Sequence, residues 1–329
     1  MNFQVGGEFI LRKKLFHALL LMTMFSLVSC GGGDGGYVGL HTGLTGGGTV
    51  KFTIINATSE TLYVYNYPTL DNNPTTPVTL APNHPLQLPL LVKPEVRIYF
   101  SNKPLSNSLE KGAQPDVFNF SKDATVTYSF MEYFYEPLYS RYNVNLSYID
   151  DYSYPITIKF SNVPTSYTGC ESGFEYGFTS LTAVKNALKS QTDYRWDALI
   201  WPAVVETDWD SDKYKGITID RIVGPNKVWP NSGGHWVPHS YDAFSASLPM
   251  DGHQLFISFT NWDGWQGLTQ SDNPSPSGTG YVKALHSAAK ADKNGNYGFY
   301  CYPKDDQTNV FAYVPDSTTC TITIHPHDK

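Results

Sequence analysis

Two acidic residues, Glu132 and Asp150, stand out because they lie in or beside segments that otherwise favour β-strands. Glu132 interrupts the aromatic run Phe130–Tyr135, where a carboxylate is a poor strand former and calls for a functional reason. Asp150 closes another strand-like segment eighteen residues later. Two carboxylates that face each other across a cleft, one as acid and one as base or nucleophile, are what hydrolysis of a glycosidic bond requires. Paired carboxylates on β surfaces are also commonly solvated, so the spacing alone does not decide.

Strand patterns surround these two residues. Short segments rich in alternating, β-branched and aromatic residues are separated by Asn- and Pro-rich turns, which is the spacing expected of a sandwich or barrel. No helical periodicity of useful length precedes Ser180. We therefore predict a mainly β fold, whose strands before residue 170 cover residues 49–55, 61–65, 78–80, 95–100, 124–130, 144–149 and 156–160.

The pattern changes after residue 170 and changes back near the C-terminus. Helices are predicted where capping residues and apolar spacings of three and four occur, and short strands are expected between them. The helices cover residues 179–191, 240–248 and 280–290, and the strands cover residues 216–223 and 254–259. Residues 310–324 return to a strand pattern and are expected to pair with the first sheet. The predicted domains are a β barrel or sandwich of residues 49–169 plus 310–329, and an inserted α/β lobe of residues 170–309.

All seven tryptophans lie in the predicted lobe. Indole rings can stack on the apolar faces of sugars, although most tryptophans in proteins belong to the core. Trp196 and Trp201 have the surroundings of core residues. The candidates for binding a carbohydrate are those in polar, Gly- or Pro-flanked contexts, namely Trp209, Trp229, Trp236, Trp262 and Trp265.

The first 29 residues have the layout of a signal peptide, with a basic cluster followed by an apolar stretch. The segment Leu27–Cys30 resembles the bacterial lipobox, in which the cysteine becomes the lipidated first residue of the mature chain. The alternatives are a plain secretory signal with a coincidental cysteine, or an N-terminal transmembrane anchor. Residues 30–48 form a Gly-rich tether. We expect a protein of the bacterial cell envelope, lipid-anchored at Cys30 to the outer membrane or cell surface, or else secreted.

Charge and composition exclude several classes of protein. Without the three basic residues and one acidic residue of segment 1–29, the chain keeps 20 basic and 29 acidic residues, a formal charge of −9. Such an acidic chain lacks the concentrated basic surface that nucleic acid requires. With 23 tyrosines, 18 phenylalanines, 27 glycines and 22 prolines but only 16% charged residues, it is a turn-rich β protein rather than a helical bundle or a disordered chain.

The remaining cysteines and the histidines give no metal site. Cys170, Cys301 and Cys320 allow at most one disulfide, and the strand pattern around Cys320 weakly favours a Cys170–Cys301 pair, although the sequence does not fix the pairing. No CxxC occurs, and Pro238 interrupts the pair His235/His239. We therefore expect neither a metal nor a cofactor.

Several segments together resemble glycoside hydrolase family 64, the β-1,3-glucanases that include the laminaripentaose-producing enzymes. The resemblance rests on Arg97–Ser101, the strand bearing Glu132, the Asn-x-Ser-Tyr-x-Asp segment 145–150 before Pro155-Ile156, and, more loosely, Arg221–Asn226. It covers most of residues 49–329. It implies a thaumatin-like β body with an α/β lobe and an open groove between them that binds β-1,3-glucan.

The same resemblance implies roles for individual residues. It places the general acid at Glu132 and the general base at Asp150, in an inverting reaction whose two carboxyl groups are roughly 6.5–9.5 Å apart with a water between them. Asn145, Tyr148 and Asp151 become candidate substrate-binding residues. No cofactor is implied, and the protein is expected to act as a monomer.

Two departures from the family pattern leave alternatives open. The segment between Glu132 and Asp150 is about two residues longer than in the family. In addition, Asp151 follows Asp150 directly, so either residue is a candidate for the general base. The choice matters because neighbouring residues in a strand point to opposite faces. The runner-up function is a non-catalytic surface module of the same fold that binds glucan or another polysaccharide. A structural or adhesive surface lipoprotein is the third class.

Overall fold

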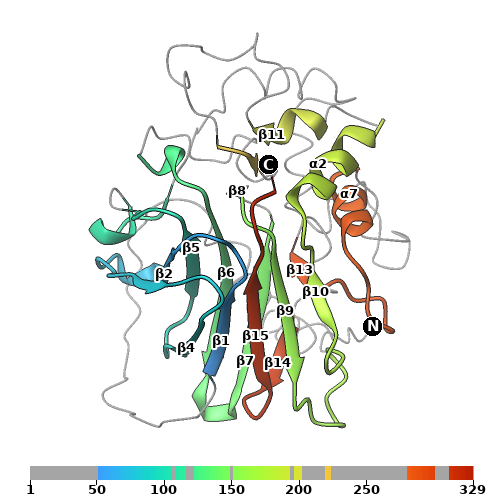
Figure 1. Ribbon diagram of the computed structural model, residues 1–329. Helices are drawn as coiled ribbons and strands as arrows, with labels where there is room; N and C mark the ends of the chain where they lie inside the picture. The colour runs from blue at the N-terminus through green and yellow to red at the C-terminus, as the bar shows by residue number, and fades with distance from the viewer. Residues whose placement is uncertain are drawn as a thin grey trace, which may run out of the picture. The chain divides into compact units, whose positions relative to one another are not determined.

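The computed structural model describes residues 51–105, 108–115, 122–148, 151–192, 196–201, 219–223, 280–300 and 311–328 (Figure 1). Its secondary structure is mainly β, as the sequence predicts. The strands are β1 (Lys51–Asn56), β2 (Leu62–Pro68), β3 (Val78–Leu80), β4 (Pro85–Pro89), β5 (Val96–Ser101), β6 (Tyr128–Glu136), β7 (Arg141–Ser147), β8 (Asp151–Tyr152), β9 (Ile156–Ser161), β10 (Glu175–Gly177), β11 (Ile200–Trp201), β12 (Arg221–Val223), β13 (Phe299–Tyr300), β14 (Phe311–Pro315) and β15 (Thr319–Ile324).

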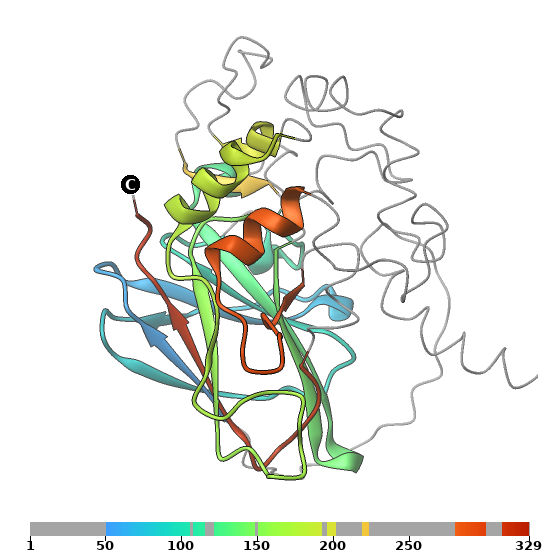
Figure 2. The same cartoon turned by 90° about the vertical axis from the view of Figure 1, so that its right-hand side faces the viewer.

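The helices are few and mostly short. They are the α-helices α2 (Leu181–Ser190) and α7 (Gly280–Ala288) and the 3-10 turns η1 (Thr69–Asp71), η2 (Leu109–Lys111), η3 (Lys122–Thr125), η4 (Pro137–Tyr139) and η5 (Trp196–Leu199). The helices α2 and α7 lie side by side (Figure 2). Asp328, near the C-terminus, accepts hydrogen bonds from the first backbone N–H groups of α2 and from its N-cap residue Ser180, which satisfies donors that a helix leaves open.

The described strands form three sheets. A five-stranded sheet has the order β10-β9-β15-β1-β4, and a seven-stranded sheet has the order β13-β7-β6-β5-β2-β3 with β14 also paired to β7. A small third sheet has the order β11-β12-β8. The two large sheets pack face to face, as ring contacts between them show. The Phe52 ring of β1 meets the rings of Tyr133 and Tyr142 edge to face, with centroid distances of 5.1 Å to Tyr133 and 5.7 Å to Tyr142. Such contacts join two inner faces into one core.

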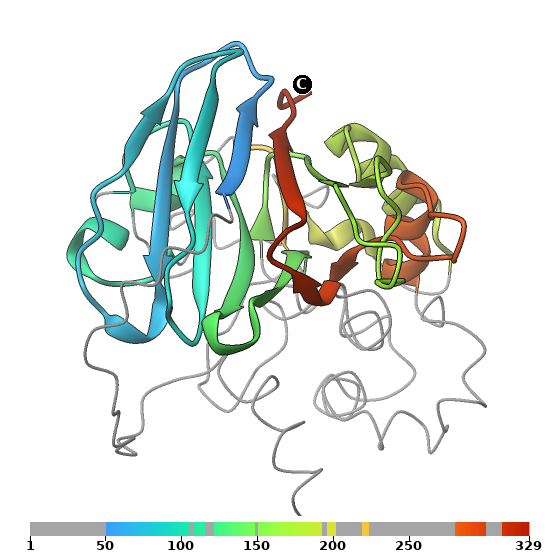
Figure 3. The same ribbon diagram turned by 90° about the horizontal axis from the view of Figure 1, so that it is seen from below.

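The last strand lies inside the five-stranded sheet rather than at its edge. β15 pairs in parallel with β1, with Cys320 opposite Phe52, and antiparallel with β9, with Cys320 opposite Phe160. Figure 3 shows the red last strand beside the blue first strand. β14 pairs with β7. The prediction that residues 310–324 pair with the sheets of residues 49–168 is therefore confirmed.

Each of the two large sheets also contains a short strand from the segment 170–309. β10 pairs with β9, and β13 pairs in parallel with β7. The predicted domain boundary at residue 170 therefore falls between two paired strands. Among the described residues, no helix is long and apolar enough to span a membrane.

The cysteines differ from the expected arrangement. Cys170 and Cys320 are both free and buried, so the favoured Cys170–Cys301 disulfide is not formed; Cys301 itself lies outside the described residues. Burial raises the pKa of the Cys170 thiol to about 12, with a further contribution from Asp292, so this thiol stays protonated and unreactive at neutral pH.

Candidate active site on the β5–β6–β7 sheet face

Glu132 lies on the face of the seven-stranded sheet opposite to the face that packs on the five-stranded sheet. The strand register aligns Tyr67, Arg97, Glu132 and Asn145 in one row across β2, β5, β6 and β7. Side chains directly opposite each other in adjacent strands point to the same face. The neighbouring residue Met131 points the other way and is fully buried. The alternation of the strand thus sets a carboxylate on the one face where it can meet solvent or a ligand.

Arg97 pairs with this carboxylate and is itself held on several sides. Its Nε donates to Oε1 of Glu132 at 2.8 Å, and its Nη1 donates to Oε1 of Gln114 at 2.6 Å. Glu95 lies 3.5 Å from Nη2, and the guanidinium carbon lies 4.9 Å from the centre of the Phe130 ring. The guanidinium therefore has little freedom, and an opposite charge at this distance stabilises the ionised form of a carboxyl group.

The Glu132 side chain remains reachable from solvent, because 18% of its surface is exposed against 10% for Arg97. Asn145, directly across from Glu132 on β7, holds a side-chain oxygen that is enclosed and has no hydrogen-bond partner within the described part of the chain. At the other end of the row, burial raises the pKa of Tyr67 and the Arg97 charge opposes that rise. The row therefore presents one partly exposed carboxylate beside one fixed cation, with the fully buried Tyr67 and the enclosed Asn145 oxygen at its two ends.

Asp151, the alternative base and a predicted substrate-binding residue, is placed elsewhere by the structure. Its carboxylate lies 3.4 Å from Nη1 of Arg221, and the two side chains are only 3% and 1% exposed. Nη2 of Arg221 donates to the carbonyl of Val126 at 3.0 Å. The pKa of Tyr128 is raised well above its ordinary value by burial and, next, by the charge of Asp151. Asp151 therefore belongs to a buried ion pair and cannot reach a polymer at the surface.

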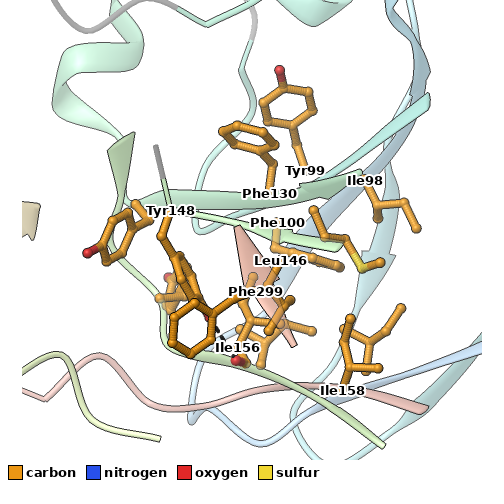
Figure 4. Close-up of a cluster of buried hydrophobic side chains, with 14 of the residues drawn as sticks. Ile98, Tyr99, Phe100, Phe130, Leu146, Tyr148, Ile156, Ile158 and Phe299 are labelled. Carbon is orange, nitrogen blue, oxygen red and sulfur yellow. Dashed lines mark hydrogen bonds between the residues drawn. The ribbon is translucent and has the colours of Figure 1, made fainter. Parts of the chain in front are cut away.

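Tyr148, a predicted substrate-binding residue, is a core residue. Its ring is fully buried and lies 4.5 Å from the Phe178 ring centre and 5.3 Å from that of Phe299. Its hydroxyl donates to the carbonyl of Ile156 at 3.1 Å (Figure 4). The sequence suggested substrate contact because tyrosine is amphipathic, but the hydroxyl is satisfied inside the core.

Several predicted site residues lie outside the described residues. These are the proposed base Asp150, the lipidation residue Cys30 and the five candidate carbohydrate-binding tryptophans, Trp209, Trp229, Trp236, Trp262 and Trp265. The core prediction for Trp196 is confirmed by its complete burial, whereas the side chain of Trp201 is not described.

Sequence reasoning did not identify the two arginine–carboxylate pairs. Arg97 and Arg221 both lie in β-strands, where an arginine flanked by apolar residues needs a partner, and that signal could have indicated an ion pair at each position. Which carboxylate each arginine meets depends on strand register. Across the described residues, no group of three or more His, Cys, Asp and Glu side chains gathers as a metal site requires.

Comparisons with known proteins gave structural likenesses. No family model and no curated protein matches the sequence. A laminaripentaose-producing β-1,3-glucanase solved with laminaritetraose is 17% identical, with a TM-score of 0.45, over 86% of this chain and all of that one. The family 64 laminaripentaose-producing β-1,3-glucanase of Paenibacillus barengoltzii is 13% identical, with a TM-score of 0.47, over 84% of this chain and 75% of that one.

A third likeness is to the family 64 β-1,3-glucanase domain of Clostridium beijerinckii, which is 14% identical with a TM-score of 0.41, over 84% of this chain and 98% of that one. TM-scores below 0.5 at these identities leave the function to be argued from the chain's own residues.

The buried pair gives a first prediction. Asp151→Asn leaves the Arg221 guanidinium buried without its carboxylate, so the free energy of unfolding should fall by about 3–5 kcal/mol. Urea denaturation measures this fall. Asp71→Asn is the matched control, because the Asp71–Lys93 pair is 27% and 43% exposed and its loss should cost less than about 1 kcal/mol. Equal losses for the two variants would show that Asp151 does not stabilise the fold in this way.

Proposed function

We propose that this protein hydrolyses β-1,3-glucan with inversion, with Glu132 as general acid and Asp150 as general base. The observation that carries the proposal is the row on the outer sheet face, in which a partly exposed Glu132 is flanked by Arg97 and Asn145. The substrate class and the two roles come from the sequence resemblance to glycoside hydrolase family 64. Loss of catalysis with retention of glucan binding is the alternative.

The Arg97–Glu132 pair bears directly on the acid role. A general acid must carry a proton before the reaction and becomes a carboxylate as the glycosidic oxygen accepts that proton. Arg97 opposes the protonated form at rest, but it stabilises the negative charge that develops on Glu132 during proton transfer. The pairing gives Arg97 a positioning and electrostatic part in the reaction without contact to the scissile bond.

The two carboxylates are tested directly by neutralising each. Glu132→Gln and Asp150→Asn should each lower the rate of laminarin hydrolysis about 10²–10⁴-fold while glucan binding and the thermal unfolding temperature stay unchanged, since positioned acids and bases supply that range. Proton NMR of the first products should show the α-anomer before mutarotation, because inversion of a β linkage yields an α-configured end. Glu110→Gln, which removes a carboxylate from another part of the fold, is the control.

Three outcomes would change the assignment. A first product of β configuration would indicate a covalent intermediate rather than a water between the carboxylates. Binding of glucan with no release of sugar would favour the binding-module alternative. Full activity of Asp150→Asn would remove Asp150 from the mechanism, and the burial of Asp151 makes that residue a poor replacement.

Arg97 gives a prediction with a pH readout. Arg97→Gln removes the cation that stabilises the Glu132 carboxylate, so the proton stays on Glu132 to higher pH. The alkaline limb of the kcat/KM–pH profile should therefore move to higher pH, and the plateau rate should fall because a weaker acid donates less readily. Arg97→Lys keeps the charge and should leave the limb nearly in place. If the alkaline limb of the kcat/KM–pH profile stayed in place in Arg97→Gln, Arg97 would have no part in the proton transfer.

We further propose that the protein is exported and held by lipid at Cys30, on the basis of the lipobox-like segment Leu27–Cys30. Cys30→Ser removes the only atom in that segment that can carry the lipid. The variant should therefore leave the membrane fraction or accumulate with its leader uncleaved, as immunoblots of fractionated cells would show. A cleaved variant that fractionates like the parent would indicate a plain signal peptide.

A further inference from the structure

The hairpin between β6 and β7 ends in an exposed aromatic surface. Leu138 and Tyr139 in the turn η4 are 76% and 67% exposed, and Tyr313 of β14, which pairs beside them, is 53% exposed. These are three of the six large hydrophobic residues that are exposed in the described part of the chain. We call the surface made by Leu138, Tyr139, Arg141 and Tyr313 the hairpin tip.

The hairpin tip is ordered by its own contacts. The Arg141 guanidinium carbon lies over two rings, 4.5 Å from the centre of Tyr139 and 4.2 Å from that of Tyr313. Oε2 of Glu136 accepts hydrogen bonds from both Nε and Nη2 of Arg141, at 2.9 and 2.7 Å. The tip therefore presents fixed apolar and aromatic groups together with a cation whose charge is already paired.

The backbone adopts unusual conformations to display these groups. Ser140 and Tyr313 have φ values of 47° and 57°, in the left-handed region that residues other than glycine rarely adopt. The Tyr313 N–H donates to Oδ1 of Asn143 at 2.6 Å, within the irregular register between Phe311 and Val314. A large exposed residue held in a strained conformation is a reason to look for a function.

The hairpin tip lies at the end of the fold where the chain enters its first strand. Phe52, the second residue of β1, packs on Tyr142, which follows Arg141 in β7. The Asp316 N–H of the turn between β14 and β15 donates to the Ser140 carbonyl. Helix α2 lies at the other end of β15, since Asp328 caps it just after that strand (Figure 1).

We propose that the hairpin tip contacts the lipid bilayer to which the protein is anchored. The proposal rests on the lipid anchor at Cys30 within the proposed function. In the sequence only residues 31–50 separate Cys30 from β1, and β1 begins at the end of the fold that carries the tip. Leucine, tyrosine and arginine are the residue types that settle at a membrane interface.

The arrangement of the rings disfavours a polysaccharide as the occupant. The Arg141 guanidinium lies over both the Tyr139 ring and the Tyr313 ring. One face of each ring is therefore already covered by a cation and is not open for stacking on a sugar. A bilayer makes no such demand, because it accepts ring edges and an aliphatic side chain together.

The test compares one added cysteine at the tip with one at the other end of the fold. Leu138→Cys and Asn186→Cys, on the exposed face of α2, are made in the anchored chain and in the Cys30→Ser chain. Each is treated with a membrane-impermeant maleimide, and the chain without the added cysteine gives the background. Leu138→Cys should react severalfold more slowly in the anchored chain than in the Cys30→Ser chain. Asn186→Cys should react equally in both.

Equal rates for Leu138→Cys in the two chains, or slowing at both positions, would overturn the proposal. Protection of Leu138→Cys by soluble laminarin without a membrane would assign the tip to a polysaccharide instead. A Cys30→Ser chain that is cleaved and still fractionates like the parent would also overturn it, because the tip alone buries too little surface to hold the protein. Laminarin hydrolysis by the same proteins reports separately on the proposed enzyme activity.

Discussion

The parallel pairing of β1 with β15 is the constraint on which the rest of the structure depends. It brings together residues more than 260 positions apart in the chain and places the last strand between β1 and β9. Without β15 the five-stranded sheet is divided, and Phe52 loses the strand that holds it against Tyr133 and Tyr142. Pairing over so long a separation costs loop-closure entropy before it yields any contact. The five-stranded sheet is therefore continuous only when the last strand of the chain is in place between β1 and β9.

The structure contains an arginine–carboxylate ion pair in each of two different environments, one buried and one partly exposed. Arg221 and Asp151 are both buried, so their mutual attraction mainly offsets the cost of removing two charges from water. Arg97 and Glu132 are partly exposed and lie on a sheet face among polar side chains. There the carboxylate keeps access to solvent while the Arg97 cation lies 2.8 Å from it. Exposure, and not the identity of the pair, separates the structural site from the candidate catalytic one.

Periodicity in the sequence was sufficient to predict many of the strands and one of the helices. Alternation and turn residues predicted β1, β2, β5 and β9 within a residue or two of their ends, except that β2 continues three residues further, and capping and spacing predicted α2. β6 begins and ends later than predicted, because an aromatic run that contains Glu132 continues the strand through the carboxylate. The strands β4, β8, β10 and β13 are too short, or too rich in proline and glycine, to show a pattern of their own. They form because a neighbouring strand offers them hydrogen bonds.

The candidate site was predictable by residue type but not by geometry. Glu132 could be singled out because a carboxylate is unexpected in an apolar strand. The burial of Tyr148 and Asp151 could not be foreseen, since both depend on how β7 and β8 pack against segments distant in the chain. The partnership of Arg97 with Glu132 depends on the register between β5 and β6. Register follows from the global arrangement of the strands rather than from either strand alone.

One strand connects the candidate site with the hairpin tip. Glu132 and Glu136 are four residues apart in β6, so about 13 Å of strand separates them. The row of Tyr67, Arg97, Glu132 and Asn145 crosses four strands of this sheet, so it runs across the strand direction, whereas β6 itself leads from the row to the tip. The Glu132 carboxylate is therefore held in place by the same strand whose end carries the exposed Leu138 and Tyr139 in η4.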